Sequence, residues 1–181
     1  MHARFTAAPP VATAPPVPAV PAAPTAPVKA AAAAAPVKAA AAAAPAAPDG
    51  RSVFRHPVRV YWEDTDAGGI VYYANYLKFF ERARTEWLRA LGIGQQALRE
   101  ADGAMFVVVH TRVAYRTPAR LDDRLDITVV LRHAGRVALT IVQQAWREQT
   151  LLAEGEIRIG CVDAGTLRPC RIPTHVLDAL A

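Results

Sequence analysis

The stretch EDTDAGGIVYYANYLKFFERARTEW at Glu63–Trp87 decides the fold, because it joins a charged, glycine-containing turn to a long helical pattern. Its first four residues include three carboxylates, and two glycines follow closely. Apolar residues then recur at helical spacing, at Tyr76, Phe80, Ala83, Trp87 and Leu91. Asn75 is a predicted N-cap and Gly92 a predicted stop, so we expect a long helix from Asn75 to Leu91.

Strand patterns lie on both sides of this helix. His56–Glu63 alternates as a half-buried strand does, with one face made by Val58, Val60 and Trp62. Ala104–Tyr115 begins as a nearly continuous apolar run, which is typical of a central strand. His110 lies in this run and is predicted to be a satisfied structural histidine.

Three further strands and two short helices complete the pattern. Residues 125–131 and 137–141 alternate and are joined by a turn at Ala134–Gly135. A last strand, Leu151–Val162, places on one face Leu151, Ala153, Ile157, Ile159 and Cys161. Short helices are expected at Gln95–Glu100 and Pro173–Leu180.

The order of elements is strand, long helix, then four strands, and the last strands are joined by short turns, which connect antiparallel neighbours. We therefore expect an α+β domain in which one long helix packs on one face of a five-stranded antiparallel sheet. A two-layer unit of this kind leaves apolar surface uncovered, so we expect a homodimer or a larger assembly.

The first 50 residues have a different composition from residues 51–181. They hold 11 of the 15 prolines and a perfect repeat, PVKAAAAAA, at Pro27–Ala35 and Pro36–Ala44. Nothing in them can form a core, so we interpret residues 1–50 as a disordered Ala/Pro-rich extension and residues 51–181 as the folded domain. The pattern is unlike a secretory signal or a membrane span, and a tether or docking arm is the functional alternative to an inert extension.

Charge and cysteine content exclude some classes of function. The net charge is +5, and residues 51–181 hold 18 basic and 15 acidic side chains without a basic run, which does not indicate nucleic-acid binding. Cys161 and Cys170 lack metal-ligand spacing, so we expect reduced thiols in the cytoplasm and no metal or redox cofactor.

The helix amino end gives the carboxylates a chemical purpose. Its first N–H groups have no partner within the helix and carry the positive end of the helix dipole. They can bind a carbonyl oxygen and stabilise negative charge that develops on it. A carboxylate just upstream can attack the carbonyl carbon or activate water, and glycines admit a ligand closely. The arrangement suits acyl transfer.

The same residues carry a family resemblance. Tyr61–Trp87 resembles the signature of the hotdog-fold thioesterases of the 4-hydroxybenzoyl-CoA thioesterase family. The segments EDTDAGG and FFERARTE, with YRTPARLDD at Tyr115–Asp123, are similar to the Tol–Pal-associated (YbgC-type) acyl-CoA thioesterases. The resemblance covers residues 54–173. It implies a hotdog fold, hydrolysis of acyl-CoA to free acid and coenzyme A, and a dimer or tetramer with sites at the dimer interface.

The resemblance also implies site residues. Asp66, the second Asp of the DxD pair, corresponds to the catalytic aspartate, and the backbone N–H of Tyr73 to the group that polarises the thioester carbonyl. Some members have His at the position of Tyr73, and roles proposed for that side chain do not transfer. The substrate can be acyl-CoA or an acyl-carrier-protein thioester.

Other candidate residues have competing interpretations. Asp66 can be a turn aspartate, and Asp64 can brace the loop while Glu63 faces solvent. Gly69, Tyr72 and Tyr76 can line the substrate site, although aromatic residues at helical spacing are commonly core. Glu81, a helix carboxylate of the kind that another thioesterase clade uses, is interpreted as a surface ion pair with Arg84. Two arginines could bind coenzyme A phosphates, Arg132 and Arg136.

Two rival functions remain open from the sequence. One is a non-hydrolytic acyl-thioester-binding module on the same scaffold. The other is a scaffolding protein for envelope or lipid-synthesis partners, with the extension as a tether. Cys161 is not a credible nucleophile, because its neighbours predict burial on a strand without an activating charge.

Overall fold

The computed structural model describes residues 52–181. The expected extension, residues 1–50, lies outside the described residues. The strands are β1 (Phe54–Arg59), β2 (Ala104–Tyr115), β3 (Arg124–Ala134), β4 (Ala138–Arg147) and β5 (Thr150–Asp163). The helices are a 3₁₀ turn η1 (Trp62–Asp64), the long α1 (Asn75–Ala90), and the short α2 (Gln95–Asp102) and α3 (Thr174–Leu180).

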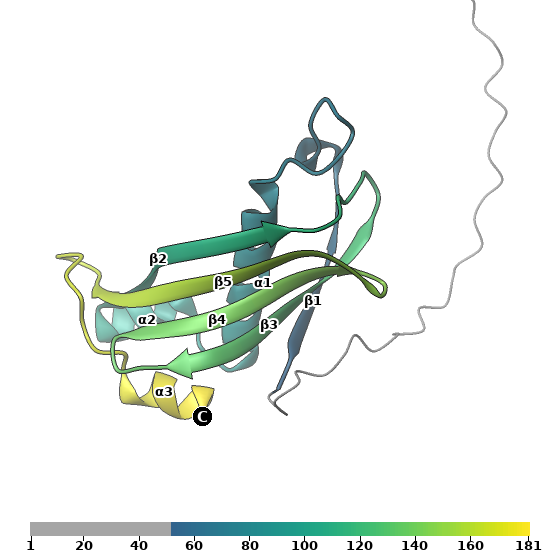
Figure 1. Ribbon diagram of the computed structural model, residues 1–181. Coiled ribbons are helices and arrows are strands. Elements are labelled where there is room, and N and C mark those ends of the chain that lie inside the picture. Colours follow the sequence, from purple (N-terminus) through teal and green to yellow (C-terminus); the bar gives the residue numbers. More distant parts are fainter. Residues whose placement is uncertain (1–51) are drawn as a thin grey trace, which may run out of the picture. The chain divides into compact units, whose positions relative to one another are not determined.

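The five strands form one antiparallel sheet in the order β1-β3-β4-β5-β2. The sheet curves around α1, which lies behind it along its concave face (Figure 1). This arrangement is the predicted α+β architecture. Gly92 follows α1 with a φ of 78°, which confirms it as the helix stop.

The core lies between α1 and the concave face of the sheet. The buried side of α1 is aromatic, with Phe79, Phe80 and Trp87 as its large members. It packs on alternating residues of the middle strands, chiefly Leu125, Ile127, Val129, Leu139, Ile141, Ile157 and Ile159. Gln143 is a buried polar exception, and it donates to the Phe80 carbonyl at 2.9 Å, so its amide is satisfied.

The first strand is shorter than the alternation predicts. It ends at Arg59, and Trp62 is 79% exposed in η1, so its predicted place on the face of Val58 and Val60 is wrong. The Asp64 carboxylate accepts the backbone N–H of Tyr61 at 2.9 Å. This local hydrogen bond folds the chain into a turn, a competition with strand pairing that is typical of aspartate.

Three other predictions are wrong in detail. The N-cap of α1 is Ala74, and Asn75 is the first helical residue. In β5, Leu151 is half-buried while Leu152 is buried, because the β4–β5 register shifts at Ala145–Trp146. His110 on β2 is exposed, next to an irregularity in the β2–β5 pairing at Val108–His110.

The strand β2 lies at an edge of the sheet, which overturns its predicted central position. Its apolar run does not reflect burial on both faces. Val108 and Val109 are 52% and 56% exposed. Among residues 52–181, no further strand pairs with this edge, so it presents apolar side chains and unpaired backbone groups together.

No helix in the described residues, 52–181, is long and apolar enough to cross a membrane.

Candidate active site

The loop between η1 and α1 is closed by backbone hydrogen bonds around its two glycines. Thr65 and Val71 form an isolated antiparallel bridge. Inside it, Asp66 N–H donates to the Ile70 carbonyl, and Gly69 N–H donates to the Asp66 carbonyl, both at 2.9 Å. Gly69 has a φ of 70°, a conformation that other residues adopt only with strain. The glycine therefore allows the tight turn that presents Asp66.

The second glycine orients the Asp66 carboxylate. Gly68 N–H donates to Asp66 Oδ1 at 2.8 Å, and a Cβ at Gly68 would lie 3.0 Å from the same oxygen. The alternative role of Asp66 as a turn aspartate is thus present in the structure. Asp66 is exposed, and within residues 52–181 its Oδ2 makes no hydrogen bond. One oxygen is held while the other faces outward.

Asp64 braces the loop against the helix, as the sequence predicts. It is 1% exposed, and its backbone carbonyl accepts both Tyr72 N–H and Asn75 Nδ2, each at 2.9 Å. Glu63 is exposed, also as predicted. The buried Asn75 therefore joins the first turn of α1 to the segment that carries Asp66. This hydrogen bond fixes the position of the Asp66 loop relative to the amino end of α1.

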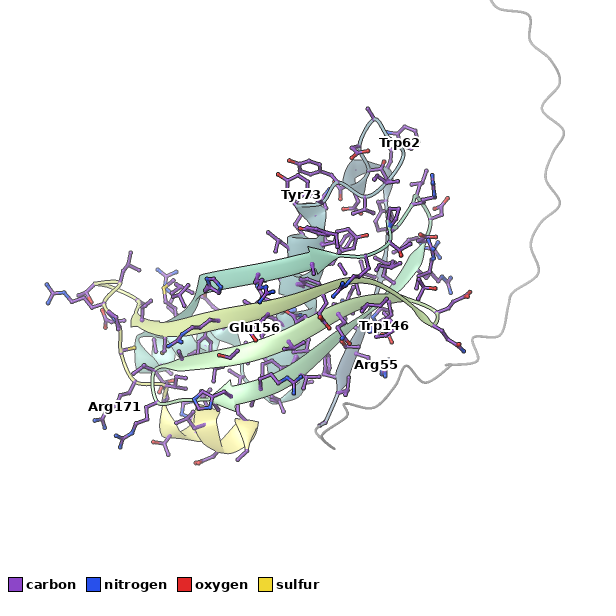
Figure 2. The ribbon with its side chains drawn as sticks, in the orientation of Figure 1. Arg55, Trp62, Tyr73, Trp146, Glu156 and Arg171 are labelled. Atoms are coloured by element: carbon purple, nitrogen blue, oxygen red, sulfur yellow. The ribbon has the colours of Figure 1, made fainter. Side chains whose placement is uncertain are left out.

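The amino end of α1 offers an unused backbone donor. Asn75 N–H donates to the Tyr72 carbonyl at 2.8 Å, and Leu77 N–H to the Ala74 carbonyl at 3.1 Å. In the part of the chain that the structure describes, Tyr73 N–H donates to no acceptor. Figure 2 shows Trp62 and Tyr73 at the same end of the molecule, where the Asp66 loop leads into α1.

Aromatic rings surround this helix end. Tyr72 and Tyr73 pack with ring centroids 4.6 Å apart, and both are exposed. Tyr76 is 3% exposed, and its hydroxyl accepts Ala119 N–H at 3.0 Å, so it belongs to the core. Burial raises the pKa of Tyr76 above its ordinary value, and the Ala119 hydrogen bond opposes that shift. Tyr72 is therefore the better placed of the two for contact with a ligand.

A hollow of about 490 Å³ lies beside Asp66. Its wall includes Gly69 and also Trp62 and Leu121, which the sequence did not single out. Trp62 was not predicted as a site residue, because the alternating pattern assigned it to the face of a strand. Leu121 lies in the YRTPARLDD segment, whose match to the family was the only available signal.

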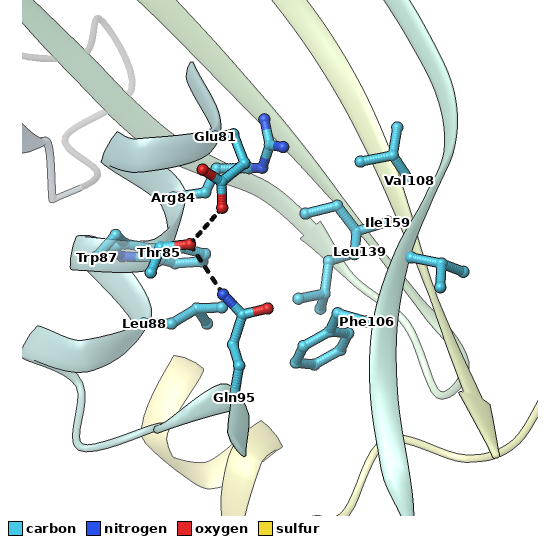
Figure 3. Close-up of a pocket in the computed structure, with 11 residues that line it drawn as sticks. Glu81, Arg84, Thr85, Trp87, Leu88, Gln95, Phe106, Val108, Leu139 and Ile159 are labelled. Carbon is cyan, nitrogen blue, oxygen red and sulfur yellow. Dashed lines mark hydrogen bonds between the residues drawn. The ribbon is translucent and has the colours of Figure 1, made fainter. Parts of the chain in front are cut away.

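A second hollow, of about 150 Å³, lies between α1, α2 and β2 (Figure 3). The Glu81 carboxylate accepts Thr85 Oγ1 at 2.8 Å, and Gln95 Nε2 donates to Thr85 Oγ1 at 2.9 Å. The predicted ion pair of Glu81 with Arg84 is wrong. Arg84 donates instead to Gln143 Oε1 at 3.0 Å, and burial lowers the pKa of its guanidinium while Glu81 raises it.

The structure does not bring the two candidate arginines to Asp66 within one chain. Val60 N–H donates to the Asp123 carbonyl at the start of β3, near the Asp66 loop. Arg132 is eight residues into β3, roughly 26 Å along the strand at about 3.3 Å per residue. The Arg136 carbonyl accepts Ile172 N–H, and Figure 2 places neighbouring Arg171 at the opposite end from Tyr73. Their role in coenzyme A binding stays a prediction.

The cysteines do not form a nucleophilic site. Cys161 is 1% exposed, and burial together with the contact to Cys170 raises its thiol pKa to about 12. Its predicted burial is confirmed, and a thiol so rarely ionised is a poor nucleophile. Among residues 52–181, no three His, Cys, Asp or Glu side chains lie close enough to hold a metal ion.

Comparison with known proteins shows which family the chain belongs to. A model of the thioesterase-like superfamily matches residues 60–180. The chain belongs to the thioesterase-like superfamily. It is 46% identical over 127 residues to an acyl-CoA thioester hydrolase YbgC of Escherichia coli, covering 70% of this chain and 94% of that one. It is 42% identical over 126 residues to the acyl-CoA thioesterase YbgC of Haemophilus influenzae, covering 70% and 93%.

A solved structure supports the same placement in the thioesterase-like superfamily. The "Probable Thioesterase" from Bartonella henselae superposes with a TM-score of 0.65 at 30% identity, over 67% of this chain and all of that chain. The hotdog fold and the family resemblance drawn from the sequence are thereby confirmed. The residues that match the thioesterase-like superfamily, 60–180, include both the Asp66 loop and the amino end of α1.

Proposed function

We propose that this protein is an enzyme that hydrolyses acyl-CoA thioesters to the free acid and coenzyme A. The observation that carries the proposal is the presence of an exposed carboxylate, Asp66, and an unused backbone amide, Tyr73 N–H, in one braced segment that leads into α1. This pairing occurs in a chain 42% and 46% identical to relatives named acyl-CoA thioesterase and thioester hydrolase.

The chemistry follows from these two groups. The thioester carbonyl oxygen accepts Tyr73 N–H, which places it at the positive end of the α1 dipole. The outward Oδ2 of Asp66 then acts on the carbonyl carbon, either by direct attack or by removing a proton from a water that attacks. Negative charge develops on the carbonyl oxygen and is stabilised by the amide. The C–S bond breaks, and coenzyme A leaves as its thiolate. After direct attack the acyl group remains on Asp66 as a mixed anhydride, which water hydrolyses to release the free acid and restore the carboxylate; after attack by water the free acid forms in the same step.

The remaining substrate contacts are proposed with the site. Gly69, which lines the hollow beside Asp66, is proposed for substrate contact together with the exposed Tyr72 and the buried Tyr76. Arg132 and Arg136 are proposed for the phosphates of coenzyme A. The acyl group can be presented on coenzyme A or on acyl carrier protein, and the geometry of Asp66 suits both, because the thioester is the same.

We also propose a homodimer with its sites at the interface, and a homotetramer as the larger assembly. The support is the exposed apolar edge of β2, where a second copy of the chain would bury Val108 and Val109. We place the protein in the cytoplasm, where free thiols such as Cys161 and Cys170 persist. A link to the Tol–Pal system is proposed from the EDTDAGG and FFERARTE segments.

The test is a panel of short, medium, long and aromatic acyl-CoA esters, with the matching acyl-carrier-protein thioesters, scored for thiol release. The wild-type chain, Asp66→Asn and the matched control Glu63→Gln are compared. Wild-type turnover that Asp66→Asn loses and Glu63→Gln keeps supports the proposal. Binding of acyl-CoA without turnover in the wild type would favour the non-hydrolytic binding module.

A further inference from the structure

The end of β2 reaches the amino end of α1 through a tyrosine hydroxyl. Tyr115, the last residue of β2, donates its hydroxyl to the backbone carbonyl of Tyr73 at 3.1 Å. The two rings also pack edge to face, with centroids 6.1 Å apart. Tyr115 is 46% exposed, so the contact lies at the surface beside the site and not within the core.

This hydrogen bond is made to the Tyr73 carbonyl, which accepts a side-chain hydroxyl, whereas the neighbouring carbonyls accept backbone N–H groups. The carbonyls of Tyr72 and Ala74 accept backbone N–H groups from Asn75 and Leu77. The Tyr73 carbonyl between them accepts the hydroxyl of Tyr115. The peptide planes on both sides of Tyr73 are therefore held, one by Asn75 N–H and the other by Tyr115.

The segment after β2 holds the same region at a second point. Ala119 N–H donates to the Tyr76 hydroxyl at 3.0 Å, and the Ala119 carbonyl accepts Val71 N–H at 2.9 Å. The ring of Tyr115 packs on that of Tyr76 with centroids 5.6 Å apart. Ala119 thus holds the chain at Val71 and at the Tyr76 side chain, on either side of Tyr73, and the Tyr115 hydroxyl holds the Tyr73–Ala74 peptide between them.

We propose that Tyr115 is a positioning residue that aims Tyr73 N–H at the thioester carbonyl oxygen. The inference rests on the proposed function. The Tyr73 N–H shares its peptide plane with the Tyr72 carbonyl, which Asn75 N–H holds directly. The Tyr115 hydroxyl holds the next peptide plane, Tyr73–Ala74, which lies between that plane and Asn75 in the chain. Without the hydroxyl the Tyr73–Ala74 plane can rotate, which loosens the hydrogen bond from Asn75 N–H to the Tyr72 carbonyl across it. The Tyr73 amide then spends less time in the orientation that the developing oxyanion requires.

The test compares Tyr115→Phe, which removes one hydroxyl and keeps the ring, with Tyr61→Phe, which removes the hydroxyl of another exposed tyrosine. Removing an oxyanion donor outright costs about 10²-fold to 10³-fold in kcat, so loosening one should cost about 10-fold. We expect Tyr115→Phe to lower kcat by this amount, with KM and the melting temperature near those of Tyr61→Phe. By amide NMR, the N–H of Asn75 should exchange faster in Tyr115→Phe.

The outcomes separate this inference from the proposed function. If the wild type hydrolyses acyl-CoA, and Tyr115→Phe matches Tyr61→Phe in kcat and Asn75 exchange, the positioning role is overturned and the thioesterase proposal stands. A rise in KM together with a lower melting temperature also overturns it, since that is a merely structural effect. If the wild type hydrolyses no thioester, the proposed function fails. The role of Tyr115 in positioning an amide for thioester hydrolysis then fails as well, even when Asn75 exchange shows that Tyr115 orders the helix end.

Discussion

The ring of Phe80 on α1 lies against the backbone of Gly155 on β5. A Cβ at Gly155 would lie 3.0 Å from Phe80 Cε2 and 3.3 Å from Ile157 Cδ1. Phe80 is 0% exposed, so its ring cannot move into solvent to make room, and the surrounding core is closely packed. The absence of a side chain at this position lets the long helix approach the sheet closely, and the close approach holds the helix that carries the site.

Gly155→Ala should therefore destabilise the domain. We expect a loss of about 1–3 kcal/mol in the free energy of unfolding, the usual cost of an extra methyl group in a packed core. Chemical denaturation of both proteins measures it. The matched control is Gly165→Ala, where a Cβ meets its nearest atom at 3.6 Å in an exposed turn. Equal stability of the two variants would show that the helix can shift away from β5.

Replacing Asp66 with Asn tests the chemistry. The amide keeps the shape and can still accept Gly68 N–H, but it lacks the charge needed to attack or to take a proton. We expect kcat to fall by about 10²-fold or more, with little change in KM or in the melting temperature. Glu81→Gln is the control for the helix carboxylate. Loss of turnover in Glu81→Gln alone would move the active site to the α1 face.

The two thiols should react at different rates. Burial and the contact with Cys170 raise the pKa of the Cys161 thiol to about 12, so it is rarely ionised at neutral pH. Cys170 is only half-buried. Brief alkylation of the native protein, followed by mass spectrometry of the peptides, should find Cys170 modified first. Cys170→Ser then isolates the rate of Cys161, and a rate as fast as that of Cys170 in the native protein would contradict the assignment.

The same pKa predicts the direction of a pH effect on stability. A cysteine thiol in an unfolded chain has a pKa near 9.0, and the pKa of Cys161 in the folded protein is higher, at about 12. The folded state then holds the proton more tightly, so its contribution is complete below about pH 9 and is lost as pH rises towards about 12. Between these values wild type should lose more unfolding free energy than Cys161→Ala. A parallel decline of the two proteins would refute this.

Removing residues 1–50 should leave activity intact. Their composition cannot build a core, so limited proteolysis is expected to trim the chain to near Arg51. The truncated and full chains are then compared for thiol release and thermal unfolding. A truncated chain that unfolds or stops turning over would show that the extension is part of the working enzyme. A pull-down lost on truncation while activity remains would support the tether.

Assembly should be visible by sedimentation. The exposed valines on the β2 edge, Val108 and Val109, indicate an interface, and a stable one buries about 1,200 Å² or more. We expect a dimer or a tetramer at micromolar concentration. Val108→Lys should shift the population towards monomer, whereas the same change at exposed Val137, in the β3–β4 turn, should not. An active, strictly monomeric wild type would reject the interface site.

Local patterns were sufficient for much of the fold and part of the site. The spacing of Phe80, Ala83 and Trp87 specified the long helix and its buried face, because a helix shows its burial pattern directly in the sequence. Short turns specified antiparallel neighbours. The crowded carboxylates and glycines predicted a tight loop before a helix, and the family resemblance singled out Asp66 from its neighbours.

The tertiary structure decided what no local pattern contains. The position of β2 at the sheet edge depends on pairing with β5 about 50 residues away, so its apolar run was misread as central. Trp62 lies in η1 and not in a strand, because local hydrogen bonds between Tyr61 and Asp64 and from Thr65 to Trp62 replace strand pairing there. Arg84 donates a hydrogen bond to Gln143 on β4, and Tyr115 donates one to the Tyr73 carbonyl, 42 residues away in the sequence. These contacts form between segments that come together only when the sheet curves around α1. Local sequence spacing therefore cannot predict them.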